Sequence, residues 1–317
     1  MKAVRIHEYG GADALRVDEI EKPQAGAGEV LIKVAVAGIN YADVMLRAGT
    51  YLTKPPLPLT PGFEVAGIIE AIGEGVGNLH TGQRVVARLA GGGYAEYAVA
   101  QASGVVPVPD NLEFGTATAL LVQGLTALGL LKKLREGQTI LVHAAAGGVG
   151  SLLVQLAKHR GARVIGTAST TEKLALVKKL GADATINYTA ADWTQQVLAA
   201  TEGKGVDLLI EMVGGEIGSR NVACLAQGGT MIIYGAASGK DFQISALGLL
   251  GKNLTVRGYT LYSETPDTLA TFTGELMSHI EAKRLRVMVQ EFPFADAAAA
   301  HRALEGRQTT GKVVLKV

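Results

Sequence analysis

The chain has 317 residues, of which 30 are Lys or Arg and 29 are Asp or Glu, so its formal net charge is +1. Hydrophobic residues make up 48% and charged residues 19%, which excludes a disordered chain and argues against a nucleic-acid partner. Cys224 is the single cysteine, so no internal disulfide and no multi-cysteine zinc cluster can form. No apolar run reaches membrane-spanning length, and we expect a cytoplasmic protein that binds no membrane.

Short strands are predicted for roughly the first 120 residues. The runs 30–37, 65–72 and 84–89 are apolar and rich in β-branched residues, and clusters of Pro and Gly separate them. This spacing indicates a partly open all-β domain. The small, apolar segment 116–131 then predicts a joining helix.

Strand and helix patterns alternate after this helix, which predicts a doubly wound parallel sheet with right-handed crossovers. The predicted strands are 140–143, 163–166, 184–187, 206–210, 230–234 and 254–257. The predicted helices are 151–160, 172–180, 192–201 and 219–225. A tail with helices at 266–283 and 295–306 and strands at 287–292 and 312–317 is expected to return to the first domain. The fold class is thus α/β, divided into 1–122, 123–264 and a returning tail at 265–317.

A glycine-rich turn follows the first strand of this alternating region. Ala145 occupies the first glycine position of a Gly-x-Gly-x-x-Gly pattern, and Gly147 and Gly150 occupy the other two. Backbone N–H groups at a helix N-terminus attract a pyrophosphate, so a dinucleotide is expected here. The expected contacts come from Ala146, Gly147, Gly148 and Val149, and a purely structural turn is the alternative.

The segment after the second strand favours NADPH over NADH. NAD sites usually place an acid there to hold the ribose hydroxyls, and none follows this strand directly. Ser169, Lys173 and Tyr188 offer a hydroxyl, an ammonium and a phenol, which suit a 2′-phosphate. Glu172 stands at the helix start, where an acid favours the helix dipole. Further expected cofactor contacts follow later strand ends, at Gly235, Ser238 and Tyr259.

Several motifs in order along the chain carry a family resemblance. They are the segments 38–43 (Gly-Ile-Asn-Tyr-Ala-Asp), 61–67 (Pro-Gly-Phe-Glu-Val-Ala-Gly), 144–150 and 310–312 (Thr-Gly-Lys). With them the whole chain resembles the medium-chain dehydrogenase/reductase superfamily, and most of all its zinc-independent quinone oxidoreductases related to zeta-crystallin. The resemblance implies a GroES-like β domain, a Rossmann domain and a homodimer.

The departures from that superfamily concern zinc. Its zinc alcohol dehydrogenases carry Cys where this chain has Asn40, and His where it has Phe63. Neither residue replaces the lost thiolate or imidazole, so the resemblance implies zinc-free, NADPH-dependent reduction of a quinone by hydride transfer. An alkenal or enoyl reductase acting on an enone or another α,β-unsaturated carbonyl is the alternative. A zeta-crystallin-like RNA-binding or structural protein is the non-enzymatic alternative.

The resemblance also assigns candidate residues. Asn40 is the candidate polar anchor for the substrate carbonyl, Tyr51 a donor in the active-site cleft, and Asp43 a residue that orients its neighbours. The structural alternatives are a turn cap for Asn40, loop packing for Tyr51 and a helix cap for Asp43. Thr126 is expected at the nicotinamide end or in helix packing, and Lys312 on the cofactor side of the cleft or at the surface.

Overall fold

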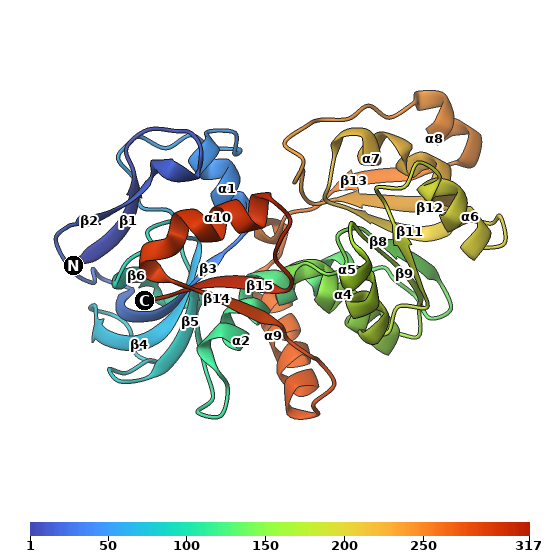
Figure 1. Cartoon of the computed structure of the whole chain (residues 1–317). Helices are drawn as coiled ribbons and strands as arrows, with labels where there is room; N and C mark the ends of the chain where they lie inside the picture. The colour runs from blue at the N-terminus through green and yellow to red at the C-terminus, as the bar shows by residue number, and fades with distance from the viewer. The chain divides into compact units, whose positions relative to one another are not determined.

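The computed structural model describes all residues from Met1 to Val317, and their contacts divide the chain into two units (Figure 1). Unit 1 comprises Met1–Val122 and Met288–Val317, and unit 2 comprises Gln123–Val287. The chain therefore returns to unit 1 at Met288 and not at 265 as expected. The difference is helix α9 (Pro266–Glu281), which contacts helix α3 (Leu125–Leu130) and so belongs to unit 2.

Unit 1 is built on a seven-stranded sheet in which β14, β15, β3, β4, β5 and β7 are neighbours in that order and β6 also pairs with β3. The strands are β3 (Glu29–Ile39), β4 (Glu64–Ile72), β5 (Arg84–Arg88), β6 (Tyr97–Gln101), β7 (Val105–Pro107), β14 (Val289–Pro293) and β15 (Lys312–Lys316). β1 (Lys2–Ile6) and β2 (Leu15–Glu19) form a separate antiparallel pair. The last strand of the chain, β15, pairs with β3, so Val313 lies opposite Ile39.

The core of unit 1 lies on the apolar residues of these strands. Strand β3 is nearly continuously buried because it has β4 on one side and β6 and β15 on the other. Three α-helices belong to this unit: α1 (Tyr41–Ala48), α2 (Phe114–Ala119) and α10 (Ala297–Glu305). Helix α2 runs on through a π-helical turn, Leu120–Gly124, into α3, so the joining helix expected at 116–131 is one interrupted helical run.

Unit 2 contains a six-stranded, wholly parallel sheet in the order β10-β9-β8-β11-β12-β13. The strands are β8 (Thr139–Val142), β9 (Arg163–Ala168), β10 (Ala184–Asn187), β11 (Val206–Glu211), β12 (Leu225–Ile233) and β13 (Thr255–Gly258). The connecting helices are α4 (Gly148–His159), α5 (Thr171–Lys179), α6 (Trp193–Ala200), α7 (Gly215–Arg220) and α8 (Ala246–Lys252). This topology confirms the predicted doubly wound sheet. The strand order reverses between β8 and β11, the point where such sheets bind ligands.

Three helices of unit 2 differ from the sequence prediction. Helix α4 begins at Gly148, three residues before the expected 151. A helix was expected at 219–225, but α7 begins earlier, at Gly215, and already ends at Arg220. The segment Asn221–Cys224 is instead a short 3₁₀ helix. Helix α8 was not predicted, and its Leu247 and Leu250 side chains are 79% and 78% exposed.

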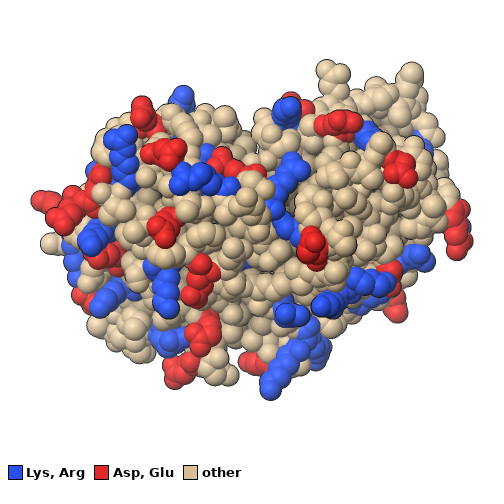
Figure 2. All heavy atoms as spheres, viewed as in Figure 1, with Lys and Arg blue, Asp and Glu red and all other residues tan.

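Charged side chains of both signs are spread over the molecular face drawn in Figure 2, with several Lys and Arg gathered along its lower edge. This distribution agrees with a formal net charge of +1. None of the helices has the length and apolar character needed to cross a membrane.

Candidate functional site

The glycine-rich turn of unit 2 joins the end of β8 to the first residue of α4. Gly147 is the N-cap of this 12-residue helix and keeps an extended backbone, and its N–H donates to the Ala144 carbonyl at 2.9 Å. The N–H groups of the first helical turn, at Gly148, Val149 and Gly150, have no acceptor within the helix. Together with the helix dipole they form a site that attracts an anionic group.

The glycines of this turn are required by close packing. A Cβ atom on Gly150 would lie 2.4 Å from the Ala144 carbonyl oxygen, and one on Gly148 would lie 2.0 Å from Oε1 of Gln123. A Cβ on Gly147 would meet only that Ala144 oxygen, at 3.2 Å. The helix start is thus pressed against the strand end, as a pyrophosphate-binding turn requires, and the residues present fit a dinucleotide.

The residues expected around a 2′-phosphate have different environments. Ser169 directly follows β9 and is half-buried. Lys173 stands in the first turn of α5, where its backbone N–H donates to Thr170 Oγ1 at 3.3 Å. Tyr188 is only 6% exposed, and its ring meets the His143 ring edge-on at 6.2 Å. Tyr188 is therefore mainly a core residue, whereas Ser169 and Lys173 share one strand end.

Two residues expected to contact the cofactor have contacts within the protein: Ser238 forms hydrogen bonds, and Tyr259 packs against a helix. The backbone N–H of Ser238 donates to the Val213 carbonyl at 2.7 Å, and its hydroxyl accepts from Lys240 N at 3.2 Å, which closes the loop after β12. The Tyr259 hydroxyl lies against α3, where a Cβ on Gly129 would come within 1.8 Å of it. Burial raises the pKa of this phenol, and the neighbouring Glu264 raises it further.

The remaining two cofactor candidates of unit 2 are placed by their elements. Gly235 lies two residues beyond the end of β12 and is half-buried. Thr126 lies on α3 and is 8% exposed, so it is buried like every other residue of this helix.

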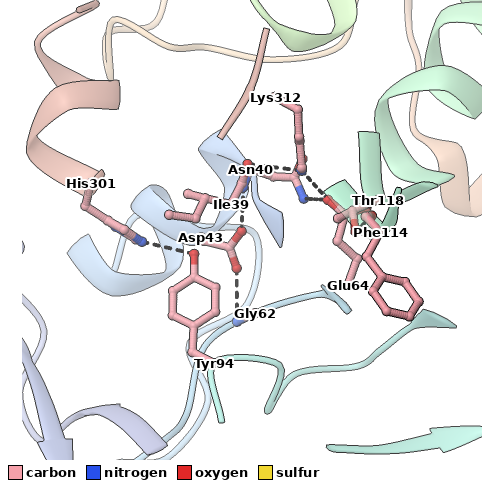
Figure 3. A network of polar contacts seen from close by, with 10 residues as sticks. All are labelled: Ile39, Asn40, Asp43, Gly62, Glu64, Tyr94, Phe114, Thr118, His301 and Lys312. Atoms are coloured by element: carbon pink, nitrogen blue, oxygen red, sulfur yellow. Dashed lines mark hydrogen bonds and ion pairs between the residues drawn. The ribbon is translucent and has the colours of Figure 1, made fainter. Parts of the chain in front are cut away.

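In unit 1 the side-chain amide of Asn40 is fixed by two charged groups (Figure 3). Asn40 is the N-cap of α1, directly after β3. Its Nδ2 donates to Glu64 Oε1 at 2.6 Å, and its Oδ1 accepts from Lys312 Nζ at 3.0 Å. An ammonium only donates and a carboxylate only accepts, so these partners determine which end of the amide faces each.

Lys312 is not at the surface, which corrects one of the two expectations for it. It is the first residue of β15, is 1% exposed, and forms an ion pair with the fully buried Glu64 (Figure 3). Its Nζ also donates to the Ile39 carbonyl at 3.1 Å. Glu64 belongs to the motif at 61–67, but no role was expected for it. An acid within the apolar run that begins β4 was the signal that would have found it.

Asp43 has the structural environment of a helix cap. Its carboxylate is fully buried and accepts from Asn40 N at 2.8 Å and from Gly62 N at 3.1 Å. It thereby ties the start of α1 to the turn before β4. Burial raises the Asp43 pKa to about 7, against the lowering effect of the Asn40 N–H and of Lys312.

Tyr51 lies in the loop after α1 and is half-buried, with its ring 5.8 Å from the Phe63 ring. Burial raises the pKa of its phenol, and the charge of Asp43 raises it further. The hydroxyl therefore stays protonated at neutral pH and can donate a hydrogen bond, but it is a weaker acid than an ordinary tyrosine.

No group of three or more His, Cys, Asp or Glu side chains in the structure could hold a metal ion. Asn40 and Phe63 stand where the zinc enzymes of the resembling superfamily have ligands. The two charged groups that contact the Asn40 side-chain amide, Glu64 and Lys312, form an ion pair with each other.

Comparisons with known proteins cover both units. The alcohol dehydrogenase GroES-like domain matches residues 26–110, and the zinc-binding dehydrogenase domain matches residues 148–278. A quinone oxidoreductase of Rattus norvegicus is 34% identical over 99% of this chain and 97% of its own length. A mycobacterial protein solved with NADPH has a TM-score of 0.94 at 38% identity, with 100% of both chains covered. The Escherichia coli quinone oxidoreductase solved with NADPH reaches 0.95 at 33% identity, again over 100% of both chains.

Proposed function

Because the chain belongs to the quinone oxidoreductases of the medium-chain dehydrogenase/reductase superfamily, we propose that it reduces quinones by hydride transfer from NADPH. The observation that carries the proposal is the glycine-rich turn between β8 and α4, whose close packing against the Ala144 carbonyl leaves no room for a side chain at Gly150. Two full-length structural relatives were solved with NADPH, which supports the same cofactor.

The residues that would hold NADPH come from the strand ends of unit 2. Gly148 and Val149 would offer N–H groups to the pyrophosphate, and Ser169 and Lys173 would take the 2′-phosphate. When bound, NADPH supplies the hydride.

Asn40 and Tyr51 are the proposed donors toward the quinone oxygen, where negative charge builds as the hydride arrives. Hydrogen-bond donors fixed in advance stabilise such charge without reorganising during the reaction. Glu64 and Lys312 hold the Asn40 amide in one orientation, and the raised pKa keeps the Tyr51 phenol protonated. Asp43 holds the backbone of Asn40 and is a positioning residue.

A two-part experiment tests cofactor choice. Thermal melts with NADPH and with NADH are expected to show the larger shift for NADPH. Lys173→Met is expected to remove that difference, because it removes the ammonium at the strand end. Lys179→Met, on the exposed side of the same helix, is the matched control and should keep it. Equal shifts for the two coenzymes in the unaltered protein would refute the phosphate site.

An NADPH-oxidation assay over quinones, alkenals and enoyl thioesters tests the substrate class. Quinones are expected to be the best substrates, and activity should survive prolonged chelation because no zinc ligand stands at Asn40 or Phe63. Higher turnover on enals or enoyl thioesters would favour the α,β-unsaturated carbonyl reductase instead. Salt-sensitive RNA retention in a filter-binding assay would favour the non-enzymatic alternative.

The same family membership leads us to propose a homodimer. The outer strand of the sheet in unit 2, β13, has one neighbour only, and Leu247 and Leu250 of α8 are strongly exposed. An unpaired edge and apolar side chains are both covered readily by a second copy. Light scattering on the purified protein measures the state directly.

A further inference from the structure

Four buried polar side chains form a chain of hydrogen bonds across unit 2. His143 follows β8, Thr167 lies on β9, Glu211 ends β11, and Asn221 starts the 3₁₀ helix after α7. All four are fully buried. His143 Nδ1 lies 2.8 Å from Thr167 Oγ1, its Nε2 lies 2.8 Å from Asn221 Oδ1, and Asn221 Nδ2 donates to the Glu211 carboxylate.

We call the chain Thr167–His143–Asn221–Glu211 the relay. The partners fix the direction of each hydrogen bond in it. Glu211 accepts from Asn221 and also from the backbone N–H groups of Val213, at 2.5 Å, and Gly214, at 2.7 Å, so both of its carboxyl oxygens are acceptors. The oxygen of the Asn221 amide therefore faces His143, whose Nε2 must carry the hydrogen. His143 Nδ1 is then unprotonated and accepts from the Thr167 hydroxyl.

Burial favours this neutral imidazole. It lowers the His143 pKa, and the opposing effect of Glu211, 3.8 Å from Nε2, is smaller. The other rings packed on His143 are those of Tyr188 and Trp193, which carry no charge at neutral pH. The hydrogen bonds thus fit one arrangement of hydrogens, with the Glu211 carboxyl oxygens accepting at one end.

The Glu211 end of these hydrogen bonds holds the turn that starts α7. Gly214 and Gly215 both have positive φ, of 76° and 58°, and the first helical hydrogen bond runs from Gly218 N to the Gly214 carbonyl at 3.2 Å. The turn also anchors the loop after β12, because Ser238 N donates to Val213 O at 2.7 Å and Gly215 N donates to Lys240 O at 3.0 Å. Both loops follow strand ends on the β11 side of the switch point, and His143 follows the strand on its other side.

We propose that the relay from Thr167 through His143 and Asn221 to Glu211 positions the loops after β11 and β12 for NADPH binding. His143 is accordingly a positioning residue and has no part in the transfer itself. The inference rests on the proposed function for the identity of the cofactor. Losing the relay is expected to weaken NADPH binding roughly tenfold, the scale of one buried hydrogen bond, and to change turnover at saturation much less.

Two substitutions at one position test the relay. The amide nitrogen of Gln reaches the place of Nε2 and can donate to Asn221, whereas that of Asn sits at the place of Nδ1 and cannot. His143→Gln is expected to keep the Kd for NADPH within about twofold, and His143→Asn to raise it roughly tenfold, both measured by calorimetry. Melting temperatures without NADPH separate binding from stability. If His143→Asn fails to fold, Thr167→Val, which removes only the far hydroxyl, should raise the Kd in the same direction.

A spectroscopic measurement gives an independent result. With ¹⁵N-labelled histidine, and with His143→Gln to assign the signal, the imidazole is expected to be neutral and protonated on Nε2. A hydrogen on Nδ1, a charged ring, or an unchanged Kd in the Asn variant would overturn the relay. Failure of the unaltered protein to bind NADPH would instead sink the proposed function and, with it, the relay's role toward that cofactor.

Discussion

Glu64 and Lys312 are the residues on which the candidate site of unit 1 depends most. Both are almost completely buried, and both hold the amide of Asn40. Removing one partner leaves the other charge buried without compensation, which is far more costly than removing the pair. The ion pair therefore links the stability of unit 1 to the orientation of a proposed substrate contact.

We expect Lys312→Met to lower the free energy of unfolding by about 3–5 kcal/mol, because Glu64 would remain as an uncompensated charge. The double variant Glu64→Gln with Lys312→Met should recover a large part of that loss. Urea unfolding followed by circular dichroism measures both. The fluorescence of Trp193, the single tryptophan, reports unit 2 and serves as an internal control.

A matched surface substitution calibrates this result. Lys204 pairs with Glu202 where both side chains are more than three-quarters exposed, at 78% and 79%. Lys204→Met should leave the unfolding transition almost unchanged, since exposed pairs contribute little. A Lys312→Met variant as stable as Lys204→Met would show that the buried pair does not matter.

Local motifs predicted some residues of this site. Contacts between residues that lie far apart in the sequence could not be predicted in this way. Asn40 and Asp43 are neighbours in one motif, and the helix cap that joins them was among the alternatives. The partner of Lys312 lies 248 residues away along the chain, and no local pattern identifies it. For Cys224, the apolar residues around it in the sequence are enough to indicate a buried side chain. It is buried, and burial raises the pKa of its thiol to about 12, so it stays unreactive.

At the scale of elements, the parallel strands were the most predictable part of the chain. Buried strands are apolar runs bounded by turns, and the six strands of unit 2 were all located. The start of α4 was not located, because the glycines that begin this helix read as loop when only propensity is considered. Tertiary contacts decide that start: the turn before it is pressed against the end of β8.

Gly150→Ala tests this packing at the start of α4. The added methyl would lie 2.4 Å from a backbone oxygen that cannot rotate away, so we expect unit 2 to lose about 1–3 kcal/mol of stability. The midpoint of the Trp193 fluorescence transition in urea measures the change. Binding of NADPH should weaken in parallel.

Gly274→Ala is the control for that substitution. Gly274 is an exposed residue inside α9, and its new methyl would meet no atom within 4 Å. We expect a gain of roughly 0.5–1 kcal/mol from the better helix former. If both variants shift the transition by the same amount in the same direction, the contact with Ala144 is unimportant.

At the scale of the whole molecule, unit 1 is made from the two ends of the chain and unit 2 from its middle. The sequence predicted a returning tail but placed its start at 265. The apolar stripe of α9 predicts that one face of the helix is buried. It does not predict which unit buries that face, because both units have a hydrophobic core. The strand that returns, β15, pairs with β3 and brings Lys312 to Glu64.

Three fragments test this division. Residues 123–287 are expected to fold alone, with Trp193 buried as in the full chain. Residues 1–122 alone should not fold, because β3 loses one of its three neighbouring strands, β15, and Glu64 loses its counter-charge. Joining 1–122 to 288–317 through a flexible Gly/Ser linker should restore a dispersed NMR spectrum. Equal spectra for 1–122 with and without the last segment would contradict the assignment of β15 as an essential strand.

The pairing of β15 with β3 also sets the order in which the protein matures during synthesis. Translation releases β3 and β4 early, whereas β15, which pairs with β3, follows only after the whole of unit 2. The middle of the nascent polypeptide can close its own core first, which inverts the usual order from N- to C-terminus. Until β15 emerges from the ribosome, β3 has an unpaired stretch of edge and Glu64 lacks its counter-charge, so a chaperone that shields this edge would act in that interval.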